Sequence, residues 1–66
     1  MGNAREVIDG LEIFASHLPQ MWVCAEHDVI YGPDASKVQL TSDEMGRLDQ
    51  LTWYVEPESG HWALFV

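Results

Sequence analysis

The hydrophobic residues near the start of the chain follow the repeat of a helix. Between residues 7 and 18, apolar side chains recur at spacings of three and four, which predicts an amphipathic helix. Asn3 is suited to be its N-cap, Glu6 completes a capping box, and Pro19 ends it. Gly10 is expected to cost this helix about 1 kcal/mol relative to Ala. The predicted core-facing stripe consists of Val7, Ile8, Leu11, Phe14, Ala15 and Leu18.

Residues 21–31 are rich in β-branched and aromatic types, which favours strands over a helix. His27 and Asp28 tolerate the backbone of a tight turn, so we expect a hairpin in which Glu26 faces Val29. Alternation then divides the side chains between the two faces of the sheet. The predicted core face carries Met21, Val23, Ala25 and Ile30, and the opposite face carries Trp22, Cys24, Glu26, Val29 and Tyr31.

A second helix is predicted after a loop over residues 32–37 and a short extended stretch over 38–40. Thr41 and Glu44 form a capping box, and Leu40 with Met45 matches a hydrophobic staple, so the helix should run from about residue 42 to 52. Asp43 and Arg47 are spaced to form an ion pair worth about 0.2–0.5 kcal/mol. The expected apolar edge is formed by Met45, Leu48 and Leu51.

Residues 53–66 predict a second hairpin, closed by a turn over residues 57–60, in which Glu56 faces His61. Its core face would carry Trp53, Val55, Trp62, Leu64 and Val66, and its other face Tyr54, Glu56, His61, Ala63 and Phe65. The order α-β-β-α-β-β predicts an α+β fold, an antiparallel sheet with two helices on one face. The uncovered face would then combine aromatic and acidic residues, namely Trp22, Tyr31, Tyr54 and Phe65 with Glu26, Glu56 and His61.

Composition limits the class of protein. A chain of 66 residues has room for one core, so we expect a single domain over residues 1–66, and the apolar fraction of 47% favours a folded chain. A single Cys excludes an internal disulfide and a four-cysteine zinc site. No apolar run approaches the ~20 residues of a membrane span, and residues 1–10 are too acidic for a leader peptide. We therefore expect a cytoplasmic protein that does not bind a membrane.

The charge of the chain indicates the kind of partner. Eleven acidic residues against three basic ones give a net charge of −8, which is opposite to what direct binding of nucleic acid requires. The solubility of a small domain needs a net charge of about 2–8, and this chain lies at the upper end of that range. Binding of a basic protein partner is therefore an explanation to consider beside plain solubility. Carboxylates can stand in for phosphates on such a surface. The predicted partner-binding residues are Glu26, Asp28, Asp34, Asp43, Asp49, Glu56 and Glu58, with Trp22 and Tyr54 as apolar anchors.

Candidate chemistry is sparse. Cys24 and His27 form a C-x-x-H pair that Glu26, Asp28, His17 or His61 would have to complete as a metal site. Alternation along a strand sends Cys24 and His27 to different sides, and the chain holds none of the motifs of a phosphate-binding loop, a hydrolase or a metalloprotease. We expect no metal, no cofactor and no enzymatic activity. A metal-binding or catalytic domain that uses Cys24 and His27 is the third hypothesis.

The stretch CAEHD at residues 24–28 is followed by Val29-Ile30-Tyr31, a helix over 41–51, Trp53 and a last strand containing Trp62. In this pattern the chain resembles small open reading frames of phages and prophages. In size, acidity and α/β content it also resembles phage anti-CRISPR proteins, several of which mimic DNA. The resemblance implies an inhibitor that occupies a basic nucleic-acid-binding surface of a bacterial defence complex, such as a CRISPR interference complex, in the host cytoplasm.

A second hypothesis is a small structural or oligomerising phage module. In that case the aromatic sheet face would be the interface between protomers, and the charge would only keep the chain soluble. The expected oligomeric state is a monomer or a weak homodimer.

Overall fold

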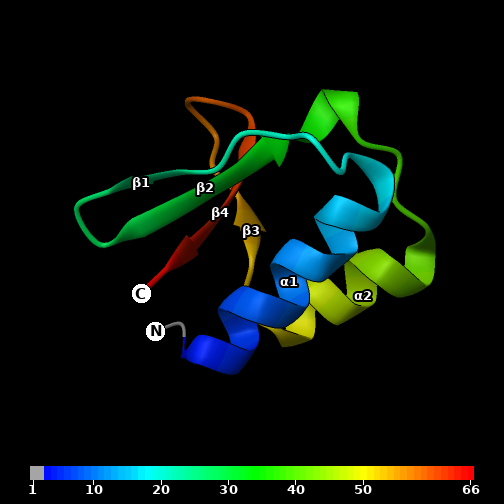
Figure 1. Ribbon diagram of the computed structural model, residues 1–66, viewed down its shortest axis with the longest axis horizontal. Coiled ribbons are helices and arrows are strands. Elements are labelled where there is room, and N and C mark those ends of the chain that lie inside the picture. The colour runs from blue at the N-terminus through cyan, green and yellow to red at the C-terminus, as the bar shows by residue number, and fades with distance from the viewer. Residues whose placement is uncertain (1–2) are drawn as a thin grey trace.

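The computed structural model describes residues 3–66, which form two helices and a four-stranded sheet (Figure 1). The strands are antiparallel and lie in the order β1-β2-β4-β3. The predicted α+β class and the predicted order of helices and strands are therefore confirmed. In chain order the elements are α1 (Ala4–His17), β1 (Cys24–Glu26), β2 (Val29–Asp34), the 3₁₀ helix η1 (Ala35–Lys37), α2 (Ser42–Gln50), β3 (Tyr54–Val55) and β4 (His61–Phe65).

Helix α1 begins and ends where the sequence predicts, with the Asn3–Glu6 capping box formed and Leu18 as its C-cap. Its buried side differs from the predicted stripe, because Ile8 is 41% exposed and Ala15 is exposed as well. Phe14 is buried as the stripe predicts, and Gly10, which the stripe did not include, is buried as well. The absence of a side chain at Gly10 lets the Trp53 indole lie against the helix backbone, where its Nε1–H donates a hydrogen bond to the Glu6 carbonyl oxygen at 2.9 Å.

The first hairpin has the predicted register, with Glu26 opposite Val29 and Cys24 opposite Tyr31. His27 adopts a left-handed backbone with φ 55°, as the two-residue turn requires. The loop predicted over residues 32–37 is wrong: β2 continues through Gly32 and Pro33 to Asp34, and η1 follows it. Pairing with β4 shifts by one residue between Tyr31 and Asp34, which is a β-bulge. Val38, predicted as extended, has an extended backbone but lies outside any strand.

Helix α2 starts with the predicted Thr41–Glu44 capping box and ends at Gln50, two residues earlier than expected. The predicted Asp43–Arg47 pair is wrong, because the Arg47 Nη2 atom lies 3.3 Å from the Asp9 Oδ2 atom of α1. Arg47 of α2 therefore forms its ion pair with α1 and helps to hold the two helices together. Leu48 and Leu51 are buried as predicted, whereas Met45 is 47% exposed.

The second hairpin also has the predicted register. Tyr54 lies opposite Ala63, and the Glu56 amide donates to the His61 carbonyl oxygen at 2.8 Å. Gly60 closes the turn with φ 72°, a conformation that disfavours other residues.

One hydrophobic cluster lies between the helices and one face of the sheet, which we call the inner face; it consists of Phe14, Leu48, Leu51, Trp53 and Leu64. Ile30 and Trp62 pack against it as the alternation predicts. Four residues assigned to the core by alternation are exposed instead: Val23, Ala25, Val55 and Val66. Three of them lie in or beside the edge strands β1 and β3, and Val66 follows the last strand, so the helices do not cover the margins of the sheet (Figure 1). No helix among residues 3–66 has the length and apolar character needed to cross a membrane.

Candidate functional site

The sheet has a second face, turned away from the helices, which we call the outer face. The register places on it Cys24, Glu26, Val29, Tyr31, Tyr54, Ala63 and Phe65. Tyr54 and Phe65 stack with their ring centroids 5.6 Å apart, and Phe65 is 53% exposed. Ala63 is fully buried because it pairs with Tyr31 on one side and Tyr54 on the other. The predicted uncovered aromatic face is therefore present.

A groove of about 420 Å³ crosses this face, and we call it the sheet groove. Strand β1 and the residues before it form one wall, and the β3–β4 turn forms the other. Its lining residues are Trp22, Cys24, Glu26, Tyr31, Gly32, Ser59 and His61. Gly32 has no side chain, and the His61 Nδ1 atom lies 3.0 Å from its carbonyl oxygen, which fixes the imidazole against the strand.

Trp22 is 92% exposed, which is unusual because Trp is highly buried on average in folded proteins. Its position follows from Pro33. Continued along the observed register, Trp22 would pair with Pro33, which has no amide hydrogen to donate to the ladder. Strand β1 therefore starts only at Cys24, and the indole remains beside the groove without a partner strand to pack it.

Two carboxylates, Glu26 at the end of β1 and Glu56 directly after β3, lie near the Tyr31 phenol. Partial removal from water raises the pKa of Tyr31, and the negative charges of Glu56 and Glu26 raise it further. Among residues 3–66, neither carboxylate forms an ion pair with Lys or Arg. The chain has only three such cations; Arg5 and Arg47 both contact Asp9 on the helical side, and Lys37 ends η1. Both hairpins, over residues 21–34 and 53–66, carry none.

Two of the predicted contact residues hold local structure. Asp34 caps η1, because its Oδ1 atom accepts from the Ser36 amide at 2.9 Å and the Ser36 hydroxyl at 2.8 Å, and these bonds lower its pKa. Glu56 holds the second turn. The Ser59 hydroxyl and the amides of Glu58 and Ser59 lower the pKa of Glu56. Both carboxylates therefore stay ionised, and Glu56 positions Ser59 in the groove wall.

The seven acidic residues predicted to bind a partner do not lie on one surface. Glu26 and Glu56 lie at the outer face, and Asp28 and Glu58 lie in the turns at the ends of its strands. Asp34 lies opposite His61 at the end of β2. Asp43 and Asp49 are exposed on α2, which packs on the inner face.

Of the predicted anchors, Trp22 lines the groove, whereas Tyr54 stacks on Phe65 outside it. The sequence-based list of contact residues missed five groove residues, Cys24, Tyr31, Gly32, Ser59 and His61. Alternation had already assigned Cys24, Tyr31 and His61 to the uncovered face, and this assignment could have identified them as groove residues. Ser59 carried no signal, because it lies in a turn.

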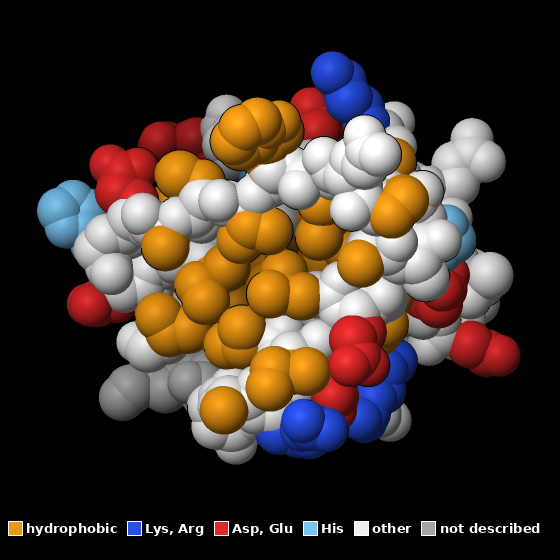
Figure 2. Space-filling view, viewed as in Figure 1, with side chains coloured by type: hydrophobic (Ala, Val, Ile, Leu, Met, Phe, Trp, Pro, Cys, Tyr) orange, Lys and Arg blue, Asp and Glu red, His pale blue; other side chains and the backbone are white. Residues whose placement is uncertain are grey.

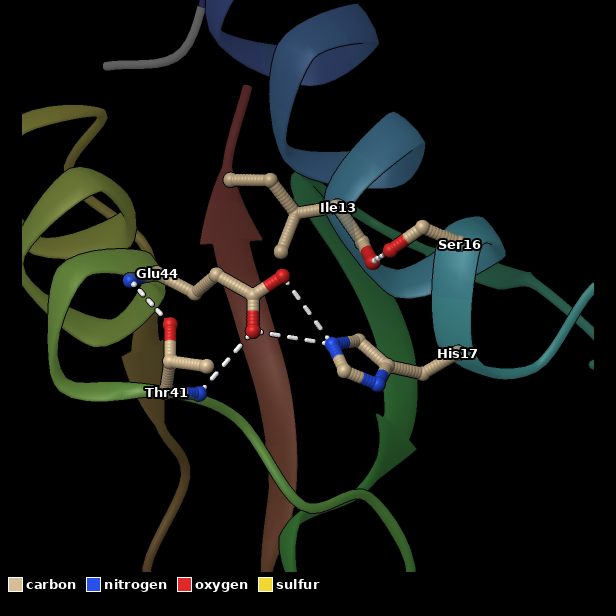
Figure 3. A network of polar contacts seen from close by, with 5 residues as sticks. All are labelled: Ile13, Ser16, His17, Thr41 and Glu44. Carbon is tan, nitrogen blue, oxygen red and sulfur yellow. Dashed lines mark hydrogen bonds and ion pairs between the residues drawn. The ribbon is translucent and has the colours of Figure 1, made fainter.

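A separate polar contact joins the two helices (Figure 3). The His17 Nε2 atom, from the last turn of α1, lies 2.8 Å from the Oε1 atom of Glu44 in the first turn of α2. The same Oε1 atom accepts a hydrogen bond from the Thr41 amide at 2.9 Å. Sequence reasoning found the capping role of Glu44 and missed His17, since the two residues are 27 positions apart.

Acid should weaken the fold through Glu44. The Thr41 amide and the His17 side chain lower the pKa of Glu44 below its ordinary 4.5, so the unfolded chain binds this proton at a higher pH than the folded one. The stabilisation is present above pH 4.5 and is lost as the pH falls through the lower, folded-state pKa. We expect the unfolding midpoint of Glu44→Gln to depend less on pH between 3 and 5 than that of the parent protein.

Asp49→Asn is the matched control, because it removes one charge from the same helix and breaks none of these contacts. Urea unfolding at a series of pH values measures the difference. The assignment would be wrong if both variants and the parent showed the same pH dependence.

Among residues 3–66, no three His, Cys, Asp or Glu side chains are grouped to hold a metal ion. Cys24 is an exposed free thiol on β1, and His27 lies in the turn. The geometry therefore offers no support for the metal-binding hypothesis.

No protein-family model, curated protein or solved structure matches the chain. The resemblance to phage and anti-CRISPR proteins stays a hypothesis.

Proposed function

We propose that this protein is a protein-binding module that holds a basic surface of a partner through the outer face of its sheet. The observation that carries the proposal is the sheet groove, where the exposed Trp22 indole and the Tyr31 ring lie with Glu26 and Glu56 on a face without Lys or Arg. An aromatic groove bordered by carboxylates that have no Lys or Arg partner among residues 3–66 fits the side chains of Arg and Lys.

Two physical effects favour such a partner. Charge-assisted hydrogen bonds between a guanidinium and a carboxylate are stronger than neutral ones, and Arg also stacks on Trp and Tyr rings. The net charge of −8 would attract a basic partner before contact and speed the encounter. Both effects weaken with salt, because the charges on this face are exposed.

In its narrower form, the proposal is that the protein is a phage-encoded inhibitor that acts in the bacterial cytoplasm by occupying a nucleic-acid-binding site of a bacterial defence complex. Its support is the acidic surface and the resemblance of the sequence to anti-CRISPR proteins. Because the acidic residues do not share one surface, only some of them would contact the defence complex. The contact would be centred on the sheet groove and on Glu26, Asp28 and Glu58. Asp43 and Asp49 on α2 would lie outside it.

A second candidate function is self-association through the aromatic part of the outer face. The stacked Tyr54 and Phe65 favour it, because Phe65 exposes 53% of its surface beside a second ring. Salt separates the two functions, since an aromatic interface between copies responds little to ionic strength whereas a carboxylate–cation contact weakens.

Charge reversal on the two sides of the molecule tests the proposal. We expect Glu26→Lys with Asp28→Lys to weaken binding of a protein partner captured from bacterial lysate at least tenfold. Asp43→Lys with Asp49→Lys makes the same change in net charge on α2 and should weaken it far less. Glu56 is left unchanged because it holds the β3–β4 turn.

The measurement is affinity capture with each tagged variant at low and at high salt, followed by titration of the recovered partner. Far-UV circular dichroism checks that all variants are folded. Equal losses in both double variants would mean that net charge alone drives binding and would refute a specific outer-face site. Capture that persists at high salt would favour the aromatic contact.

A further inference from the structure

Strand β1 lies at the margin of the sheet, paired with β2 on one side only. Figure 1 shows both helices away from its free side. The other margin, β3, is only two residues long. We infer that the free edge of β1 is the site where the partner docks, by adding an extended segment of alternating cationic and apolar residues as a fifth, antiparallel strand. This inference rests on the proposed function and specifies the partner's structure.

The backbone of β1 leaves hydrogen-bonding groups available on this side. In a hairpin closed by a two-residue turn, the residues that flank the turn, here Glu26 and Val29, bond to each other. The next residue, Ala25, then directs its amide and carbonyl to the open edge, and so does Val23 two residues earlier. All three β1 residues are exposed, so a strand can approach them.

The side chains along this edge determine what the added strand must carry. Trp22, Cys24 and Glu26 line the groove on the outer face. On the inner face, Val23 is 47% exposed and Ala25 is exposed. Figure 2 shows apolar side chains gathered across the middle of this view, where the β1–β2 hairpin and α1 appear in Figure 1. A strand with cations on one face and apolar residues on the other therefore matches both sides.

Charge decides between a foreign segment and a second copy of this chain. Pairing two β1 strands antiparallel would bring together two hairpins that contain Glu26 and Asp28 and hold no Lys or Arg, in two chains of net charge −8. Like charges facing each other across strands are destabilising. A cationic segment instead places its Arg side chains beside Glu26 and Trp22, where each charge gains a partner.

A synthetic peptide tests the inference without changing the protein fold. The probe is a labelled eight-residue peptide, (Arg-Val)₄, and binding is followed by fluorescence anisotropy at low salt. In antiparallel pairing, directly opposite residues share a face, so the Val residues lie opposite Val23 and Ala25 and use their amides for the bonds. We expect N-methylation of the Val amides to weaken binding at least tenfold and N-methylation of the Arg amides to leave it within about threefold, since both forms keep every charge.

Other outcomes would overturn the inference. Equal binding of the two methylated peptides would show that charge alone attracts them, and a loss only with methylated Arg would exclude the antiparallel arrangement. Failure of the unmodified peptide to bind would exclude this kind of segment. None of these results refutes the proposed function, because that is tested separately by the capture of a partner with the charge-reversed variants.

Discussion

Replacement of Phe14 by Ala is expected to unfold most of the protein at room temperature. The Phe14 side chain is fully buried and touches Trp53 edge-on, with ring centroids 5.2 Å apart, and also Trp62, at 5.8 Å. Truncation of a buried Phe to Ala costs about 3–5 kcal/mol. A single core in a chain of 66 residues rarely supplies more than about 3–5 kcal/mol of stability, so this loss removes most of it or all of it.

Phe65→Ala is the matched control. It deletes the same atoms from a ring that is 53% exposed and stacks only on Tyr54 at the outer face. Its expected cost is about 1 kcal/mol, from one exposed aromatic pair and partial burial. Urea unfolding followed by circular dichroism measures both. Similar losses in the two variants would contradict the placement of the core between the helices and the inner face.

Gly10→Ala should also destabilise the protein, although Ala is the better helix former. A Cβ atom at Gly10 would overlap the Trp53 indole, 2.5 Å from its Cε2 atom and 2.8 Å from its Cδ1 atom. The ring would have to move and lose its hydrogen bond to the Glu6 carbonyl oxygen. Overpacking costs about 1–3 kcal/mol and the lost hydrogen bond about another 1 kcal/mol, which outweighs the gain of about 1 kcal/mol in helix propensity.

Gly46→Ala provides the opposite case in the other helix. A Cβ atom there would meet nothing within 4 Å, so only the helix propensity changes. We expect a gain of about 0.5–1 kcal/mol. Thermal unfolding of the two variants should therefore shift in opposite directions. A stabilising Gly10→Ala would show that Trp53 does not rest on α1.

The contact between Gly10 and Trp53 illustrates what local sequence patterns predict and what they miss. The capping boxes, the His27-Asp28 turn and both hairpin registers depend on residues within a few positions of each other, and these predictions are confirmed. The role of Gly10 depends on Trp53, which is 43 positions away in the sequence and is brought to α1 only by folding. Sequence reasoning therefore gave Gly10 only the cost of a weak helix residue, whereas its contact with Trp53 predicts the opposite sign for its replacement.

The same distinction applies to pairing and burial. Arg47 was assigned to Asp43 in its own helix, but folding brings Asp9 within reach. Val23 and Ala25 have the correct alternation, yet alternation cannot tell whether a helix lies over that part of the sheet. The acidic residues of the outer face were predicted by alternation too. The groove between Trp22 and Ser59 was not, since it depends on Pro33 interrupting the first hairpin.

The central claim is that the outer face of the sheet is where a basic partner binds, and NMR titration tests it most directly. Hexa-arginine added to the ¹⁵N-labelled protein at low salt should shift the Trp22 indole signal and the amides of residues 22–26, 31, 56 and 58–61 the most. The Trp53 indole, buried and bonded to Glu6, provides an internal control and should stay in place. Largest shifts around Asp43 and Asp49 on α2, or equal shifts near all acidic residues, would contradict the claim.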